Sequence, residues 1–171
     1  MIKYYEEIFK LKTILRNGWK LRNAKDKISN RFESDAEHTF SMCMLALYII
    51  NKEKLKLDEL KVLKMILFHE LGEIDAGDIT PFDNISKHQK YELEFSCIKR
   101  ISDKNDMPEL LELWLEFENN QTAEAQFVKQ IDKLDAVIQS KIYSSQQNNS
   151  TLFDEFYEHS KHIIADFKKY L

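Results

Sequence analysis

Residues 58–81 read DELKVLKMILFHELGEIDAGDITP, and their pattern indicates the fold class of the chain. It opens with an aspartate suited to capping a helix, and apolar residues then recur at the spacing of one helix face. The pattern fails across residues 72–77, which begin and end with glycine, so the stretch predicts one amphipathic helix followed by a break. His69, Glu70 and Glu73 then lie together at the C-terminal end of that helix.

The rest of the chain also predicts helices. Only three glycines and two prolines interrupt 171 residues, which is too few to end the many short strands of a sandwich or barrel. Further helices are expected over residues 2–17, 34–50, 86–101, 108–118, 121–143 and 151–171. Residues 74–85 are predicted to form a loop, Trp19 to lie in a turn, and the polar run 144–150 to connect the last two helices. The predicted fold class is therefore all-α, a helical bundle.

The length and the 43% content of hydrophobic residues suit a single domain with its own core. We expect one domain over residues 1–171, with a motif-bearing core of about 11–143 and a C-terminal helix of about 151–171. The formal charge of −4 argues against binding of a nucleic-acid polymer, because no large positive field is available. An anionic small molecule would need local cations instead.

The cysteines and the apolar runs indicate the cellular setting. Cys43 and Cys97 lie in apolar stretches without metal-site spacing, which is typical of a reducing cytoplasm. No charged leader followed by an apolar segment opens the chain, and the longest apolar run, residues 42–50, is too short to span a bilayer. We expect a soluble, cytoplasmic protein without a membrane partner.

Candidate metal ligands lie within the predicted helices; they are His38, His69, Glu70 and Asp132. Imidazole nitrogens and carboxylates are natural ligands of catalytic divalent cations, and facing helices can deliver them to one interior point. Ser34 and Glu37 have the spacing of a capping box, which places His38 in the first turn of its helix. Asp132 stands beside apolar residues, where a buried carboxylate needs a cation or good hydrogen bonds. The residues alone leave open whether these side chains bind a metal or belong to structural, solvated helix faces.

Five short motifs follow one another along the chain. They are Arg16-Asn17-Gly18-Trp19, Glu33-Ser34 before His38, Phe68-His69-Glu70-Leu71-Gly72-Glu73, Gly77-Asp78-Ile79-Thr80-Pro81, and Ala123-Glu124-Ala125 with residues 127–135. Together they resemble the HD-domain phosphohydrolases, and most closely the branch that contains the 5′-deoxynucleotidases. The likeness runs from about Leu11 to Tyr143. It implies an HD-domain-like helical bundle with a metal site among its central helices.

The resemblance implies that four side chains, those of His38, His69, Glu70 and Asp132, bind one divalent transition-metal cation. Manganese, cobalt, iron, nickel and zinc all accept such a set of ligands. At position 70 the chain departs from the family, because the name-giving aspartate is replaced by glutamate. Glu70 keeps the charge and the oxygen ligands but moves the carboxylate outward by one methylene group. The choice of metal and the rate depend on how the helix accommodates this longer side chain.

The resemblance also implies which residues act on the substrate. Glu73, one helical turn after His69, is implied to be the general acid or base that moves a proton. Asp78 is implied to position the substrate or the attacking water. Arg16 is implied to bind the substrate phosphate, and Trp19 to pack on the sugar or base.

The implied activity is that of a metal-dependent phosphomonoester hydrolase, which releases phosphate from deoxyribonucleoside 5′-monophosphates. Its partner would be a small nucleotide or phosphate ester. Three alternatives stay open: an HD-type hydrolase of another nucleotide or phosphate ester, a metal- or nucleotide-binding protein whose catalysis is impaired by Glu70, and a helical interaction protein. The resemblance also suggests a homodimer, although no residue pattern demonstrates one.

Overall fold

The computed structural model describes residues 1–171, apart from the side chain of Ser150, and it confirms the predicted all-α class. The α-helices are α1 (Ile2–Phe9), α2 (Asn17–Leu21), α3 (Asp35–Glu53), α4 (Glu59–His69), α5 (Glu73–Ala76), α6 (Lys87–Asn105), α7 (Pro108–Asn119), α8 (Ala123–Gln147) and α9 (Ser150–Ser160). The 3₁₀ helices are η1 (Lys10–Lys12) and η2 (Ala165–Tyr170). Within the described residues no strand forms, and Leu15 and Ser34 make an isolated β-bridge. None of the helices of the described chain is long and apolar enough to cross a membrane.

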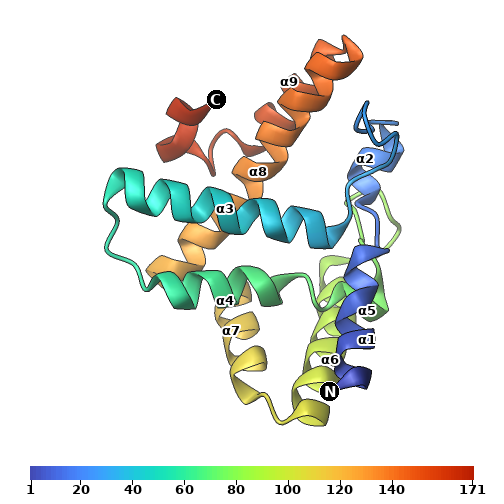
Figure 1. The fold of residues 1–171 in the computed structure, drawn as a ribbon, viewed down its shortest axis with the longest axis vertical. Helices are drawn as coiled ribbons and strands as arrows, with labels where there is room; N and C mark the ends of the chain where they lie inside the picture. Colours follow the sequence, from blue (N-terminus) through green and yellow to red (C-terminus); the bar gives the residue numbers. More distant parts are fainter.

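Helix α3 runs across the middle of the molecule, and α4 and α8 pack against it (Figure 1). A capping box fixes its start: the Ser34 side chain accepts from the Glu37 N–H, and the Glu37 carboxylate accepts from the Ser34 N–H. This cap was predicted from the sequence and is confirmed. It sets the register of the first turn, which points His38 into the interior toward α8.

The main core lies between α3, α4, α7 and α8. Each helix contributes apolar residues from one face, as helical spacing requires. Buried members of this core include Met42, Ile49, Met65, Ile66, Phe117, Ile131 and Leu134. Burial of apolar surface is the largest favourable contribution to folding, so this core holds the helices that carry the candidate ligands in fixed relative positions.

A second apolar cluster joins α6 to the segment that follows α4. Leu71 and Ile74 pack there with Cys97 and other residues of α6. Gly72 permits the close approach, because a Cβ atom at this position would lie only 2.7 Å from the Cβ atom of Glu94. The turn after α4 is therefore held tightly against α6.

The predicted first helix is wrong beyond its opening turns, because α1 is much shorter than expected. The Arg16 N–H donates to the Glu33 carbonyl (2.9 Å), and the Asp35 N–H donates to the Ile14 carbonyl (3.0 Å). Since these backbone groups pair with the segment that leads into α3, they are not available for a helix. Trp19, which was predicted in a turn, lies in the short helix α2.

Two other boundaries differ from the prediction. The loop predicted over residues 74–85 is helical at its start, because its first three residues belong to the one-turn helix α5. The polar run 144–150, expected to be a connection, continues α8 as far as Gln147. Gln146 and Gln147 donate hydrogen bonds of 3.2 and 3.1 Å to residues 25–26 of an earlier loop. These contacts stabilise a helix end that the local composition does not favour.

We predict that Gly72→Ala destabilises the protein by about 1–3 kcal/mol, because the new methyl group meets the backbone and Cβ atom of Glu94. Gly18→Ala is the matched control, since a Cβ atom there has no neighbour within 4 Å in the described structure. In its helical position this control should be neutral or stabilise by up to about 1 kcal/mol. Urea denaturation of both variants measures the difference, and equal stabilities would contradict the close packing at Gly72.

Candidate active site

Two histidine rings from different helices meet in the interior. His38 comes from the first turn of α3 and His69 ends α4, and their ring centroids lie 5.8 Å apart. The Nδ1 atom of His38 lies 2.8 Å from Asp135 Oδ2, and the Nδ1 atom of His69 lies 2.6 Å from the Ile66 carbonyl oxygen. These contacts fix both rings and leave the two Nε2 atoms facing the carboxylate of Glu70.

The two Nε2 atoms and Glu70 form a set of ligand atoms. The Glu70 Oε1 atom lies 3.6 Å from His38 Nε2 and 3.2 Å from His69 Nε2. Both nitrogens are buried, and neither has a hydrogen-bond partner in the part of the chain that the structure describes. An unpaired buried imidazole nitrogen is costly, and a divalent cation would satisfy both at once. The three residues offer ligand atoms within 4.8 Å of one another, so they fit a metal ion.

Asp132 of α8 brings a second carboxylate to the same point. Its Oδ1 atom lies 3.3 Å from His38 Nε2, and its Oδ2 atom accepts a 2.8 Å hydrogen bond from Lys133 Nζ. Burial raises the pKa of Asp132, but the positive charges of Lys133 and His38 outweigh it and hold the pKa well below its usual range. The carboxylate is therefore ionised, which is the form that ligates a metal. The structure thus brings three of the four predicted ligands within 4.8 Å of one another and places the fourth, Asp132, beside His38.

Glu70, the position at which the chain departs from the family pattern, follows the last residue of α4. Its Oε1 atom also accepts a 3.0 Å hydrogen bond from Arg16 Nη1. Burial raises the pKa of Glu70, but the positive charges of His69 and Arg16 outweigh it and hold the pKa well below its usual range. The longer glutamate side chain therefore reaches both imidazoles and the guanidinium as an ionised group.

Arg16 is held between acids from two sides. Its Nε atom lies 3.9 Å from Glu33 Oε2, and that oxygen accepts a 2.7 Å hydrogen bond from Trp19 Nε1. Trp19 is only 2% exposed, stacks on Phe156 of α9 and meets Tyr143 of α8 edge-on. The structure therefore places Trp19 in an aromatic cluster behind Arg16, where the indole supports the acid that holds the guanidinium.

Glu73 opens α5 beside the candidate ligands. It is 4% exposed, and Lys90 Nζ lies 3.6 Å from its Oε1 atom. Burial, followed by the negative charges of Glu70 and Asp35, raises the pKa of Glu73 well above its usual range. Burial and the charge of Glu70 likewise raise the pKa of Asp35 to about 7. Such carboxyl groups retain protons toward neutral pH, which suits proton transfer.

Asp78 lies in the loop after α5, next to Gly77, whose φ of 73° places it in the left-handed region. The Asp78 carboxylate accepts from the backbone N–H of Asn17, and its carbonyl accepts from the Asn17 side chain. These bonds fasten the loop to the residue that follows Arg16. Burial lowers the pKa of Arg16, but the charges of nearby acids, Glu70 foremost and Asp78 among them, outweigh it and raise the pKa.

Three residues of this site were not singled out from the sequence: Asp35, Lys133 and Asp135. Helical spacing could have indicated two of them, because Asp35 lies three residues before His38 and Asp135 lies three residues after Asp132. Each shares a helix face with a candidate ligand. Lys133 gives no such signal, because adjacent residues of a helix point in different directions.

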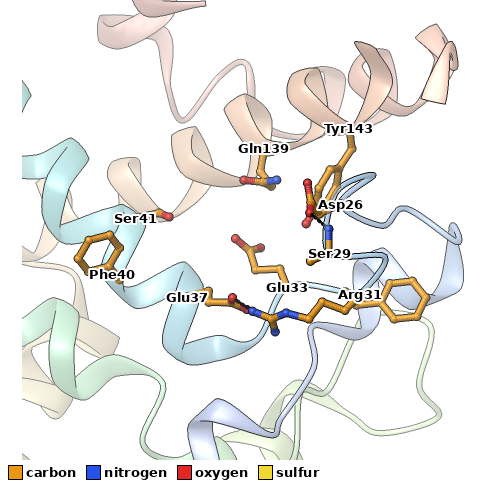
Figure 2. A pocket seen from close by; sticks show the side chains of 10 residues that line it. Asp26, Ser29, Arg31, Glu33, Glu37, Phe40, Ser41, Gln139 and Tyr143 are labelled. Carbon is orange, nitrogen blue, oxygen red and sulfur yellow. Dashed lines mark hydrogen bonds and ion pairs between the residues drawn. The ribbon is translucent and has the colours of Figure 1, made fainter. Parts of the chain in front are cut away.

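A cavity of about 400 Å³ opens beside Glu33 (Figure 2). The Glu33 carboxylate points across it toward Gln139, and Arg31 pairs with Glu37 at its edge. None of the eight residues predicted to bind metal, to bind substrate or to move a proton is among the described residues that line this cavity. Glu33 therefore faces the cavity while its other contacts reach Trp19 and Arg16.

Proteins of similar sequence match most of the chain. A protein named 5′-deoxynucleotidase HDDC2 from Homo sapiens is 31% identical over 161 residues, which cover 92% of this chain and 75% of that protein. The protein of the same name from Dictyostelium discoideum is 33% identical over 153 residues, covering 85% and 78%. A solved structure described as a "predicted metal-dependent phosphohydrolase" from Magnetospirillum magnetotacticum MS-1 is 27% identical, with a TM-score of 0.70 over 96% of this chain and 85% of that one.

A family model agrees with the resemblance read from the five motifs. The model described as HD domain matches residues 8–170, which include every residue to which the resemblance gave a role. The observed bundle, with its histidines and carboxylates converging from α3, α4 and α8, is consistent with this match. The predicted family is therefore confirmed, and the chain belongs to the HD domain family.

Proposed function

We propose that this HD-domain protein is a metal-dependent phosphohydrolase that acts on deoxyribonucleoside 5′-monophosphates. Water attacks phosphorus and the bond to the ester oxygen breaks; the phosphoryl group leaves as inorganic phosphate, and the ester oxygen takes a proton to become the 5′-hydroxyl of the nucleoside. The observation that carries the proposal is the convergence on Glu70 of two buried imidazole Nε2 atoms that have no hydrogen-bond partner within the described residues, with Asp132 beside that of His38.

The proposed substrate is supported by local charge and by the relatives. Arg16 lies beside the ligand set, and its planar guanidinium matches the geometry of phosphate oxygens. With a formal charge of −4 the chain as a whole does not attract anions, so such local cations are required. The similar proteins from Homo sapiens and Dictyostelium discoideum bear the name 5′-deoxynucleotidase, which motivates the choice of a deoxyribonucleotide.

Four residues would hold the cation in the proposed enzyme: His38, His69, Glu70 and Asp132. Two imidazoles and two carboxylates suit manganese, cobalt, iron, nickel or zinc. When bound, such a cation polarises the phosphoryl group and makes water a better nucleophile near neutral pH.

The other residues bind the substrate and move protons. Arg16 binds phosphoryl oxygens, and Glu33 and Trp19 keep its guanidinium in place. Glu73, whose pKa is raised, exchanges a proton with the attacking water or the leaving oxygen. Asp78 positions this group of residues by fastening its loop to the backbone beside Arg16.

Metal binding should release protons. Burial and the charge of Arg16 lower the pKa of His38, but its contacts with Asp132 and Asp135 outweigh them and raise the pKa to about 10 in the metal-free protein. Because a ligating nitrogen must lose its proton, the apparent metal affinity should rise with pH up to that value. Calorimetry with Mn²⁺, in buffers of different ionisation enthalpy, measures both quantities. Affinity that is independent of pH, without proton release, would contradict ligation by His38.

Asp135→Asn should lower metal affinity by about 10–100-fold, because Asp135 orients His38 through its Nδ1 atom. Asp103→Asn is the matched control, since this exposed residue of α6 pairs only with Lys99 among the described residues. Titration of each variant with Mn²⁺ gives the affinities. Equal affinities for both variants would argue against the proposed orientation of His38.

Phosphate release from matched deoxyribonucleoside and ribonucleoside 5′-monophosphates tests the activity directly. With Mn²⁺ or Co²⁺ we expect release selective for the deoxyribonucleotides, and a loss of more than about 100-fold in Asp132→Ala. Release that persists in this variant would refute the assigned metal centre. Glu70→Asp tests the alternative that this chain binds metal or nucleotide without catalysis. Activity in that variant but not in the wild type would mean that Glu70 has abolished catalysis in an otherwise intact site.

A further inference from the structure

Lys133 follows Asp132 directly in α8, and adjacent helix residues point about 100° apart. Even so, Lys133 Nζ lies 2.8 Å from Asp132 Oδ2. The lysine side chain has therefore folded along the helix surface toward the candidate metal ligands. In this conformation the positively charged ammonium of Lys133 lies beside the carboxylate of Asp132.

Neighbouring lysines of the same helix behave differently. Lys129 pairs with Glu118 at 2.9 Å, and Lys141 donates to the carbonyl oxygen of Leu171. Neither contact involves a residue of the site. Lys133 is distinguished from both by having a candidate metal ligand as its partner.

The ammonium of Lys133 is accessible, whereas the guanidinium of Arg16 is enclosed. The Lys133 side chain is 44% exposed, while that of Arg16 is 18% exposed and lies between Glu70 and Glu33. A lysine ammonium has three donor hydrogens, and the contact with Asp132 uses one. Lys133 can therefore accommodate a further acceptor that arrives from solvent.

We propose that Lys133 is a second phosphate-binding residue, which donates to a phosphoryl oxygen while Arg16 binds others. Asp132 presents Oδ1 to His38 Nε2 and Oδ2 to Lys133, so the ammonium borders the point at which the ligand atoms converge. The inference rests on the proposed phosphohydrolase function and deepens it. A phosphomonoester is a dianion and a phosphodiester a monoanion, so an additional cation at this position favours monoesters.

Metal affinity and phosphate affinity distinguish this role of Lys133 from one in which it only orients Asp132. If Lys133 only oriented that carboxylate, its loss would weaken metal binding. If it binds phosphate, its loss weakens phosphate binding and leaves metal affinity unchanged or higher, because a cation that competes for Asp132 has been removed.

The experiment compares Lys133→Met and Lys133→Arg with Lys141→Met, a control on the same helix. Three kinds of measurement are made on the full chain. Calorimetry gives the affinity for Mn²⁺ and the affinity of the Mn²⁺-loaded protein for inorganic phosphate. Steady-state kinetics gives kcat and KM for a deoxyribonucleoside 5′-monophosphate and for a nitrophenyl phosphodiester. In Lys133→Met we expect about 10–100-fold weaker phosphate binding and a comparable rise in KM for the monoester. The diester should be affected less, Lys133→Arg should restore most of the loss, and Lys141→Met should match the wild type.

Unchanged phosphate affinity in Lys133→Met would overturn the inference, and so would a loss that merely follows weaker Mn²⁺ binding. Failure of the proposed function is distinguishable from these outcomes. In that case the wild type releases no phosphate from any monoester tested, and the calorimetry still decides whether Lys133 binds the anion.

Discussion

The buried imidazole of His38 is the contact on which the arrangement of the site depends. The ring is inaccessible to solvent, touches Asp135 through Nδ1 and faces Asp132 through Nε2. An unpaired charge in such a position would be very costly, and two carboxylates from one helix offset that cost. Because the contact joins the first turn of α3 to the middle of α8, helix packing and site geometry are fixed by the same side chain.

The site contains more buried acids than the nearby cations neutralise in the described structure. The acids are Glu33, Asp35, Glu70, Glu73, Asp132 and Asp135, and the cationic side chains near them are Arg16, Lys90, Lys133 and, in the absence of metal, the protonated His38. Repulsion within this group contributes to the raised pKa values of Asp35 and Glu73. A divalent cation would relieve much of that repulsion, so the balance of charge and the two imidazole Nε2 atoms without a hydrogen-bond partner among the described residues point to the same kind of ligand.

Local signals in the sequence predicted the helical class, the cap at Ser34 and a set of candidate ligands that the structure brings together. The class and the cap depend on short spacings along one helix, which a sequence displays directly, whereas the resemblance to a family implied that ligands from three helices share one metal. The irregular backbone before Arg16 depends instead on pairing with the segment that leads into α3, and the burial of Trp19 depends on Phe156 near the other end of the chain. The direction of the Lys133 side chain is likewise set by charge in three dimensions, so no spacing rule could reveal it.

The stacking of Phe156 on Trp19 connects α9 to the position of the Arg16 side chain. This helix supplies none of the candidate ligands, yet it covers the indole that donates to Glu33, and Glu33 in turn lies beside the guanidinium of Arg16. Losing the Phe156 ring would uncover the indole that supports the arginine and leave every candidate ligand of the cation in the chain. The C-terminal segment also supplies Ile164 and Phe167 to the main core, so this end of the chain contributes both to the stability of the bundle and to the anion side of the site.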